Sequence, residues 1–235
     1  MTILITGANR GIGLGLTKMF LSMDHRVIAT AQKPETAADL HRLADNYPDG
    51  LRITQLDVTD PESIGELVNR LTGLGVRIEI LINNAGIYPD KRGAGFRETC
   101  LDGMDAVFAT NVIGVARVTQ ALLPLIPEGA NAKIVNISSG AGLIAPKTDF
   151  AHYCYGPSKA ALNMFTRTLA AELGPTGISV TAVSPGWVRT DMGGPDASLS
   201  VQESTGRLAK TILSISSKHN GCYLDVDGRE NDNVW

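Results

Sequence analysis

The sequence predicts a doubly wound α/β fold, in which one parallel sheet is covered by helices on both faces. Short β-branched runs alternate with segments of helical period along the whole chain, which is the pattern of such a sheet. No internal repeat and no Pro/Gly-rich linker interrupts this alternation. With 235 residues, 43% of them hydrophobic, the chain can form one large core. We therefore predict a single domain over residues 1–235, with halves of about 1–130 and 131–235.

Seven strands and six long helices are expected. The strands lie at residues 2–6, 26–30, 51–57, 78–82, 133–137, 179–183 and 222–225. The helices lie at 11–23, 36–46, 61–71, 101–126, 155–173 and 201–216, each with apolar residues on one stripe. Three irregular stretches, 88–96, 140–152 and 185–199, directly follow strands. They should gather at the carboxyl edge of the sheet, where open α/β folds bind ligands.

Composition and charge limit the kinds of partner. A net charge of -3 and a pI near 5.8 provide no basic field, so no nucleic-acid partner is expected. Cys100, Cys154 and Cys222 form no CxxC pair or Cys/His cluster, so we expect no metal site and a reducing compartment. No signal-peptide pattern is visible, and apolar runs such as residues 80–82 are far shorter than the roughly 20 residues of a membrane span. We expect a cytoplasmic protein that binds small molecules and no membrane.

A glycine-bearing turn follows the first strand, in the run Thr-Gly-Ala-Asn-Arg-Gly-Ile-Gly at residues 6–13. Gly7 permits a tight turn, Gly11 lets a pyrophosphate approach backbone N–H groups, and Gly13 lets the next helix pack closely on the strand. The spacing G-x3-G-x-G differs from the common dinucleotide fingerprint and from the P-loop. We favour a phosphate-binding turn, with a purely structural turn into a helix as the alternative.

A turn of this kind after the first strand of an α/β fold can bind a dinucleotide, and the end of the second strand then distinguishes NAD from NADP. An acid there would hydrogen-bond the 2′-hydroxyl of NAD and repel the 2′-phosphate of NADP. Ala31 stands where we expect that acid, whereas Arg10 and Lys33 could attract a phosphate. NADP is therefore predicted. NAD is the alternative, because Gln32 carries no charge and either cation could be an ordinary solvated side chain.

Tyr155 and Lys159 lie four residues apart at the start of a predicted helix, on one helical face. A nearby cation favours the phenolate, so we expect Lys159 to lower the pKa of Tyr155 and to allow proton exchange near neutral pH. Tyr153 has no lysine four residues later. A hydroxyl at Ser138 or Ser139 could hydrogen-bond the substrate oxygen. Taken alone, the tyrosine and lysine could also be ordinary surface residues.

Together these motifs resemble those of the short-chain dehydrogenase/reductase family. The resemblance rests on the glycine motif at 6–13, Asn-Asn-Ala-Gly at 83–86, Tyr-x3-Lys at 155–159 and Pro-Gly-Trp-Val-Arg-Thr at 185–190, in family order over nearly the whole chain. It implies a Rossmann-type fold with a seven-stranded parallel sheet and an NAD(P)-dependent oxidoreductase. The long separation of Ser139 and Tyr155 is similar to that in the carbonyl-reductase branch that includes C-factor and the sniffer protein.

The resemblance also implies residue roles. Tyr155 acts as the acid/base, Lys159 also orients the nicotinamide ribose, Ser139 polarises the carbonyl with Ser138 as the fallback, and Asn111 maintains a proton relay. The predicted cofactor-binding residues, besides Tyr155 and Lys159, are Gly7, Asn9, Arg10, Gly11, Ile12, Gly13, Gln32, Lys33, Asp57, Val58, Asn84, Ala85, Gly86, Pro185, Gly186, Val188 and Thr190.

The predicted function is the NADPH-dependent reduction of an aldehyde, ketone or quinone by hydride transfer. The alternative is a cofactor-binding signalling or regulatory protein, similar to C-factor, with little turnover. By analogy with the family we expect a homodimer or homotetramer. The loop around Gly193 and Gly194 can act as a hinge over the substrate, and Val234 and Trp235 should pack against the domain or a neighbouring subunit.

Overall fold

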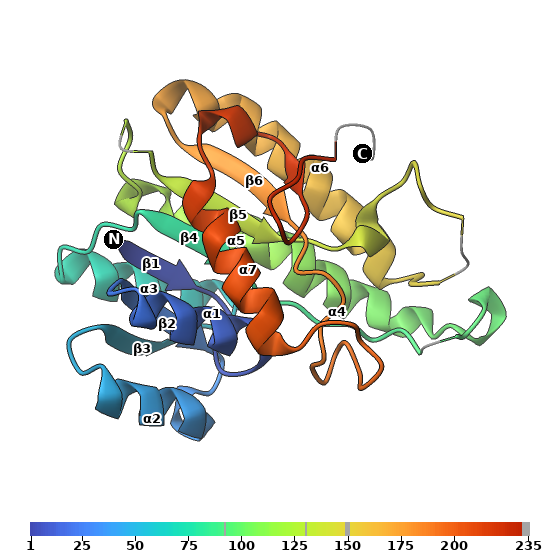
Figure 1. The fold of residues 1–235 in the computed structure, drawn as a ribbon, viewed down its shortest axis with the longest axis horizontal. Helices are drawn as coiled ribbons and strands as arrows, with labels where there is room; N and C mark the ends of the chain where they lie inside the picture. Colours follow the sequence, from blue (N-terminus) through green and yellow to red (C-terminus); the bar gives the residue numbers. More distant parts are fainter. Residues whose placement is uncertain (92, 130, 149–150, 232–235) are drawn as a thin grey trace.

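The seven predicted strands form one parallel sheet. The structure is a computed structural model and describes residues 1–91, 93–129, 131–148 and 151–231, so the expectation for Val234 and Trp235 falls outside it. The sheet order is β3-β2-β1-β4-β5-β6-β7, and neighbouring strands run parallel (Figure 1). The strands are β1 (Thr2–Ile5), β2 (Arg26–Ala31), β3 (Leu51–Gln55), β4 (Ile80–Asn83), β5 (Lys133–Ile137), β6 (Ser179–Val183) and β7 (Tyr223–Leu224).

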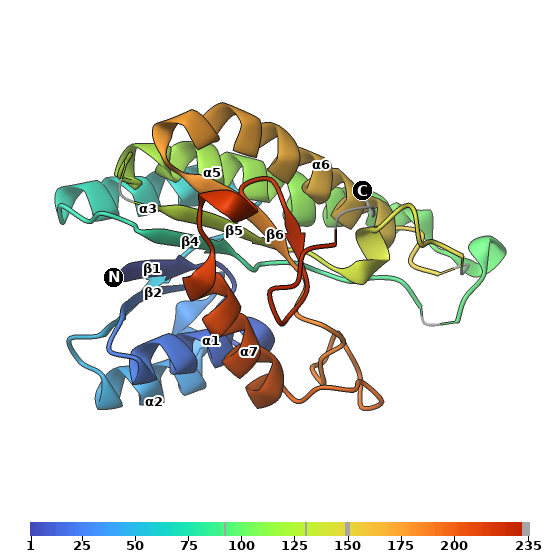
Figure 2. The same cartoon turned by 45° about the horizontal axis from the view of Figure 1, so that its top comes forward.

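Helices cover both faces of the sheet, as predicted (Figure 2). One face carries α1 (Gly11–Ser22), α2 (Ala38–Asn46) and α7 (Val201–Ser214). The other face carries α3 (Pro61–Gly73), α5 (Val115–Leu122) and α6 (Tyr155–Leu173), and the short α4 (Met104–Phe108) packs against α6. The architecture is therefore the Rossmann-type doubly wound fold, with two helical layers around a central sheet.

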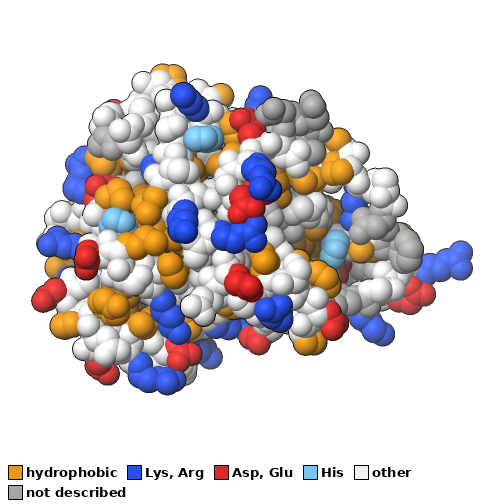
Figure 3. Space-filling view, in the orientation of Figure 1, with side chains coloured by type: hydrophobic (Ala, Val, Ile, Leu, Met, Phe, Trp, Pro, Cys, Tyr) orange, Lys and Arg blue, Asp and Glu red, His pale blue; other side chains and the backbone are white. Residues whose placement is uncertain are grey.

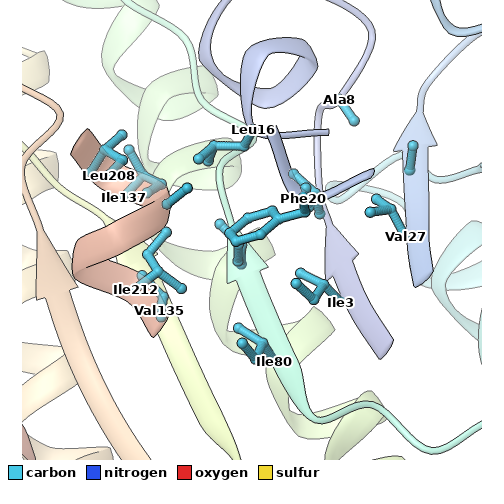
Figure 4. Packing of buried hydrophobic residues seen from close by; sticks show 14 of the residues in the cluster. Ile3, Ala8, Leu16, Phe20, Val27, Ile80, Val135, Ile137, Leu208 and Ile212 are labelled. Atoms are coloured by element: carbon cyan, nitrogen blue, oxygen red, sulfur yellow. The ribbon is translucent and has the colours of Figure 1, made fainter. Parts of the chain in front are cut away.

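The core is divided by the sheet into two apolar layers. Side chains alternate between the faces of a strand, so Ile3 joins the layer with Phe20 and Ile212, whereas Leu4 joins the opposite layer with Val118. Figure 4 shows the first layer, where α1 and α7 meet above β1, β4 and β5. Because both faces of the central strands are buried, the strand sequences are almost continuously apolar.

The predicted helix at 101–126 is a series of shorter segments. Between α4 and α5, residues Ala109–Gly114 form a wider π-helical stretch, and short 3-10 segments flank the series at Leu101–Gly103 and Leu123–Leu125. By length and composition the stretch Leu101–Leu125 could cross a membrane, contrary to the expectation that the apolar runs are far too short for a span. Its inner residues are buried in the domain, where the series packs on α3 and α6, so it serves here as part of a helical layer.

The sheet has its topological switch point between β1 and β4. These two strands are neighbours, yet β2 and β3 lie between them in the chain, because the sheet grows first in one direction and then in the other. The connections that leave β1 and β4 therefore separate and open a crevice at the carboxyl edge.

On the molecular face in Figure 3, Lys and Arg side chains are interspersed with Asp and Glu.

Candidate active site

A cavity of about 1490 Å³ opens at the carboxyl edge of the sheet. It is lined by the segments that directly follow six of the strands, β1 to β6. The predicted site residues along it are Gly7, Asn9, Arg10, Gly11, Ile12, Gln32, Asp57, Val58, Asn84, Ala85, Gly86, Ser139, Tyr155, Lys159, Pro185, Gly186, Val188 and Thr190. Gly13, Lys33 and Asn111 do not line the cavity. One site thus collects motifs that are distributed over both halves of the chain.

The glycines of the turn after β1 are required by close backbone packing. Gly7 and Gly11 have φ angles of +63° and +54°, which L side chains rarely adopt. A Cβ on Gly7 would lie 2.9 Å from the Cα of Ala85, and a Cβ on Gly13 would overlap the Gly7 carbonyl oxygen. Gly13 therefore does not line the cavity, and its role is to let α1 pack closely on the end of β1.

The turn after β4 is bonded directly to the glycine turn. The side-chain amide of Asn84 donates to the carbonyl oxygens of Thr6 and Gly7, both at 2.9 Å. The backbone N–H groups of Asn84 and Ala85 both donate to Thr6 Oγ1 at 3.0 Å. This arrangement fixes the two loops that leave the switch point.

The N-terminus of α1 faces this fixed turn. Among the described residues, no side chain caps the helix, so its first N–H groups remain available to an anion. A cradle in which side chains at Gly7 and Gly11 would be strained, beside a helix N-terminus, fits the pyrophosphate of a dinucleotide.

Gln32, and not Ala31, faces the cavity after β2. Ala31 is buried, so it does not hold the position that we expected of an NAD-selecting residue. Gln32 Nε2 donates to Asp57 Oδ2 at 2.7 Å, and Asp57 Oδ1 also accepts from the backbone N–H and the hydroxyl of Thr59. Burial raises the pKa of Asp57, but the hydrogen bonds from Thr59 and Gln32 outweigh it and the pKa is lowered. Lys33 is exposed outside the cavity.

Arg10 is engaged in an ion pair. Its Nη1 lies 2.7 Å from Oδ2 of Asp191, and both side chains are exposed. The pair connects the glycine turn to the loop after β6. An exposed pair of this kind contributes little to stability, so Arg10 can be diverted to another anion at small cost.

Tyr155 begins α6, and Lys159 follows one helical turn later. The Lys159 ammonium is buried and donates to the Ile137 carbonyl oxygen at 2.8 Å, and it lies 5.5 Å from the centroid of the Tyr155 ring. Burial lowers the pKa of Lys159 to about 8. Burial raises the pKa of Tyr155 to about 12, against the lowering effect of a hydrogen bond with Ser139. The pKa of Tyr155 is therefore raised where the sequence predicted a lowered one, with burial as the largest cause.

The structure separates Ser139 from its neighbour Ser138. Ser139 lines the cavity, is hydrogen-bonded to Tyr155 and accepts from the Ala141 N–H at 3.2 Å. Ser138 also borders the cavity, but its side chain is buried and its hydroxyl donates to Asn163 Oδ1 at 2.5 Å. Only Ser139 has the contact with the phenol that the predicted chemistry requires.

Tyr153, the tyrosine two residues before Tyr155, packs on Phe96 with ring centroids 5.3 Å apart and does not line the cavity. The structure thus brings Tyr155, and not Tyr153, to the predicted site.

Asn111 lies in the π-helical stretch and is fully buried. Its Oδ1 accepts from the Ile87 N–H at 2.9 Å, and its Nδ2 donates to the Ile87 carbonyl oxygen at 3.0 Å and to Ser158 Oγ at 3.1 Å. The side chain thus hydrogen-bonds both the segment after β4 and the first turn of α6. It lies behind the cavity wall.

The loop after β6 forms another wall of the cavity. Gly186 has a φ of +76°, and Thr190 Oγ1 accepts from the Gly193 N–H at 2.9 Å. The indole N–H of Trp187 donates to the Gly193 carbonyl oxygen at 2.9 Å. These bonds order the loop around Gly193, for which a hinge was predicted. A Cβ on Gly11 would lie 3.4 Å from Thr190 Cγ2, so the loop lies close to the glycine turn.

Several cavity residues were not identified from the sequence. Tyr88 and His152 line the cavity, and Tyr88 Oη lies 3.0 Å from His152 Nδ1. The Tyr88 ring meets the Tyr155 ring edge to face, with centroids 5.1 Å apart. Trp187 and Met192 also line it. These residues stand in irregular stretches with no periodic pattern, so the only signal was their place after predicted strands.

Comparison with known proteins agrees with this geometry. The family model for short chain dehydrogenases matches residues 1–198. C-signal of Myxococcus xanthus is 37% identical over 153 residues, which cover 65% of this chain and 91% of that protein.

Solved structures of similar proteins cover almost the whole chain. The carbonyl reductase Sniffer of D. melanogaster superposes with a TM-score of 0.90 at 34% identity, covering 97% of this chain and 98% of its own. The NADPH-bound carbonyl reductase from chicken fatty liver superposes with a TM-score of 0.87 at 36% identity, covering 98% of each chain. The chain belongs to the short-chain dehydrogenase/reductase family of NAD(P)-dependent oxidoreductases.

Proposed function

We propose that this protein is an NADPH-dependent reductase that converts a small aldehyde, ketone or quinone to the corresponding alcohol or hydroquinone, with Tyr155 as the proton donor. One observation carries the proposal. Tyr155 lines the cavity in hydrogen-bonding contact with Ser139, and the Lys159 ammonium lies 5.5 Å from the centroid of its ring. A phenol is protonated at neutral pH, so Tyr155 has a proton to donate to a carbonyl oxygen in the cavity.

Each residue has a distinct task in this reaction. The bound NADPH supplies the hydride. Tyr155 donates its proton to the substrate oxygen, and the Ser139 hydroxyl donates a hydrogen bond that stabilises negative charge developing there. Lys159, held by the Ile137 carbonyl oxygen, stands beside the phenol ring and can assist its reprotonation. Asn111 acts from behind the wall, by holding the backbone around the site.

NADP is the proposed cofactor, with NAD as the less favoured alternative. Among the described residues, no Asp or Glu in β2 or in the turn that follows it lines the cavity. The carboxylate that would repel the 2′-phosphate of NADP is therefore missing from this turn. Arg10 lines it and can exchange its exposed ion pair with Asp191 for a phosphate. The chicken carbonyl reductase with NADPH bound has the same fold. Lys33, which is outside the cavity, supports the proposal less than Arg10 does.

The activity is tested with purified protein, NADPH and a panel of aldehydes, ketones and quinones, by following the loss of reduced-cofactor absorbance. We expect turnover with at least one class, and a loss of at least about 100-fold in kcat for Tyr155→Phe. An equally active Tyr155→Phe variant would exclude Tyr155 as the proton donor.

Dissociation constants for NADPH and NADH, measured for the wild type, Arg10→Ala and Lys33→Ala, test the cofactor. We expect only Arg10→Ala to weaken the binding of NADPH more than the binding of NADH.

A regulatory protein that binds the cofactor with little turnover is the second candidate. The observation that favours it is the similarity to C-signal of Myxococcus xanthus. The contact between Ser139 and Tyr155 and the position of Lys159 favour the enzyme, since a pure sensor does not need them. Tight NADPH binding without turnover on the whole panel would decide for the regulatory role.

A further inference from the structure

We propose that residues 87–90, the segment that we call the 87–90 strap, position Tyr155 for proton transfer, and that Asp90 is the main positioning residue. The inference rests on the proposed role of Tyr155 as the proton donor. The strap follows the turn after β4, whereas Tyr155 begins α6, so the two segments are far apart in sequence.

Asp90 caps the helix that begins with Tyr155. Its Oδ2 accepts from the Tyr155 N–H at 2.8 Å, and its Oδ1 accepts from the Cys154 N–H at 3.0 Å. The first N–H groups of a helix need such acceptors, and the N-cap residue Cys154 supplies no side-chain acceptor. A carboxylate at this place also interacts favourably with the helix dipole. Asp90 therefore determines where the backbone of Tyr155 lies.

The carbonyl side of Tyr155 is connected to the same strap. Ser158 Oγ donates to the Tyr155 carbonyl oxygen at 2.7 Å and accepts from Asn111 Nδ2 at 3.1 Å. Asn111 bonds both the N–H and the carbonyl oxygen of Ile87, the first residue of the strap. One amide side chain thus joins one end of the strap to the first turn of α6.

The ring of Tyr155 is held by the middle of the strap. Tyr88 meets it edge to face, with centroids 5.1 Å apart, and Tyr88 Oη lies 3.0 Å from His152 Nδ1. Asp90, Ser158 and Tyr88 therefore restrain the backbone N–H, the backbone carbonyl and the ring of Tyr155, respectively. Asp90 does not line the cavity, so its effect on the site passes through the start of α6, at Cys154 and Tyr155.

The kinetic test compares Asp90→Asn with Asp105→Asn, which removes the same charge from an exposed position on α4. Because a misplacement of about 1 Å can cost about 100-fold in rate, we expect Asp90→Asn to lower kcat at least about tenfold. The substrate KM and the NADPH dissociation constant should stay within about twofold, and Asp90→Glu should retain more activity than Asp90→Asn. In a Tyr155→Phe background, Asp90→Asn should cause no further loss. An equal loss in both backgrounds, or no loss in the native one, would overturn the proposal.

A second readout does not depend on turnover. The backbone N–H groups of Cys154 and Tyr155 should exchange with solvent at least about tenfold faster in Asp90→Asn, by NMR, while Asp105→Asn leaves them unchanged. Unchanged amide exchange in Asp90→Asn would overturn the proposed role of the 87–90 strap, even if the enzyme is active. If the wild type reduces no carbonyl compound, the proposed function fails, and amide exchange alone then decides whether Asp90 holds Tyr155.

Discussion

Burial shifts the ionisable groups of Tyr155 and Lys159 toward their neutral forms. The Tyr155 phenol has a pKa of about 12 and the Lys159 ammonium one of about 8, in each case with burial as the largest cause. The ammonium has one hydrogen bond to the Ile137 carbonyl oxygen, which offsets part of the burial cost. The surroundings of both groups thus disfavour charge.

The lowered pKa of Lys159 predicts a pH-dependent contribution to stability. Between pH 8 and the ordinary lysine value of 10.5, the folded protein releases this proton while the unfolded chain retains it. The unfolded state then binds more protons, so the free energy of unfolding contributed by Lys159 rises with pH. Relative to Lys159→Met, the wild type without added cofactor should therefore gain stability from pH 7.5 to 9.5, by at most about 3 kcal/mol.

Urea unfolding of both proteins at constant ionic strength measures this difference. The range ends at pH 9.5, below the ordinary tyrosine pKa of about 10, so that most tyrosines keep their protons and the remaining ionisation is shared by both proteins. Parallel stability profiles for the two proteins would show that Lys159 titrates normally in the folded state.

Among the secondary-structure elements, α1 depends most on close packing, since it must approach β1 and the turn after β4. Gly13 stands where a Cβ would meet the Gly7 carbonyl oxygen and Asn84 Nδ2, the latter at 2.6 Å. Gly65, in α3, has no atom within 4 Å of a Cβ at its position among the described residues. The two glycines are both helical, but only the first is required by its neighbours.

Alanine substitution should therefore have opposite effects at these positions. Gly13→Ala should destabilise the protein by about 1–3 kcal/mol, because backbone atoms must move. It should also weaken NADPH binding, because the turn would shift. Gly65→Ala should stabilise the protein by about 0.5–1 kcal/mol, since alanine is the better helix former. Denaturant unfolding and a cofactor titration test both, and similar stabilities for the two variants would contradict this account of Gly13.

At the scale of the whole molecule, a buried polar chain crosses the apolar core beneath the site. Asn83 Nδ2, on β4, donates to Thr119 Oγ1 on α5 at 3.0 Å and to Asn136 Oδ1 on β5 at 2.8 Å. Asn136 in turn donates to Thr166 Oγ1 on α6 at 2.8 Å. The chain joins two central strands to two helices of one layer. Such a network is stabilising only while its members are paired.

Asn83→Ala and Asn136→Ala should each lower the free energy of unfolding by about 2–3 kcal/mol, because each leaves buried partners unsatisfied. The double variant should be less destabilised than the sum of the two, by about 1 kcal/mol, since the second substitution removes a group that the first has already left unpaired. Urea unfolding of the four proteins completes the cycle. Strict additivity would mean that the two side chains act independently.

The fold class and the predicted site positions were already determined by the sequence. Strand and helix periods are local properties, and in a parallel sheet they suffice to place the loops after β1, β4, β5 and β6 at one edge. The spacing of Tyr155 and Lys159 likewise places them on one face of any helix. These features depend on neighbours in the chain, so they could be predicted without coordinates.

Contacts between distant segments were decided only by the tertiary structure. In the structure, Ser139 and not Ser138 contacts the Tyr155 phenol, and Gln32 and not Ala31 lines the cavity. Asp90 caps the N-terminus of α6. The pKa of Tyr155 is also raised and not lowered, with burial as the largest cause. Burial and hydrogen bonding across the crevice depend on which segments meet in space, and no local period of the sequence contains that information.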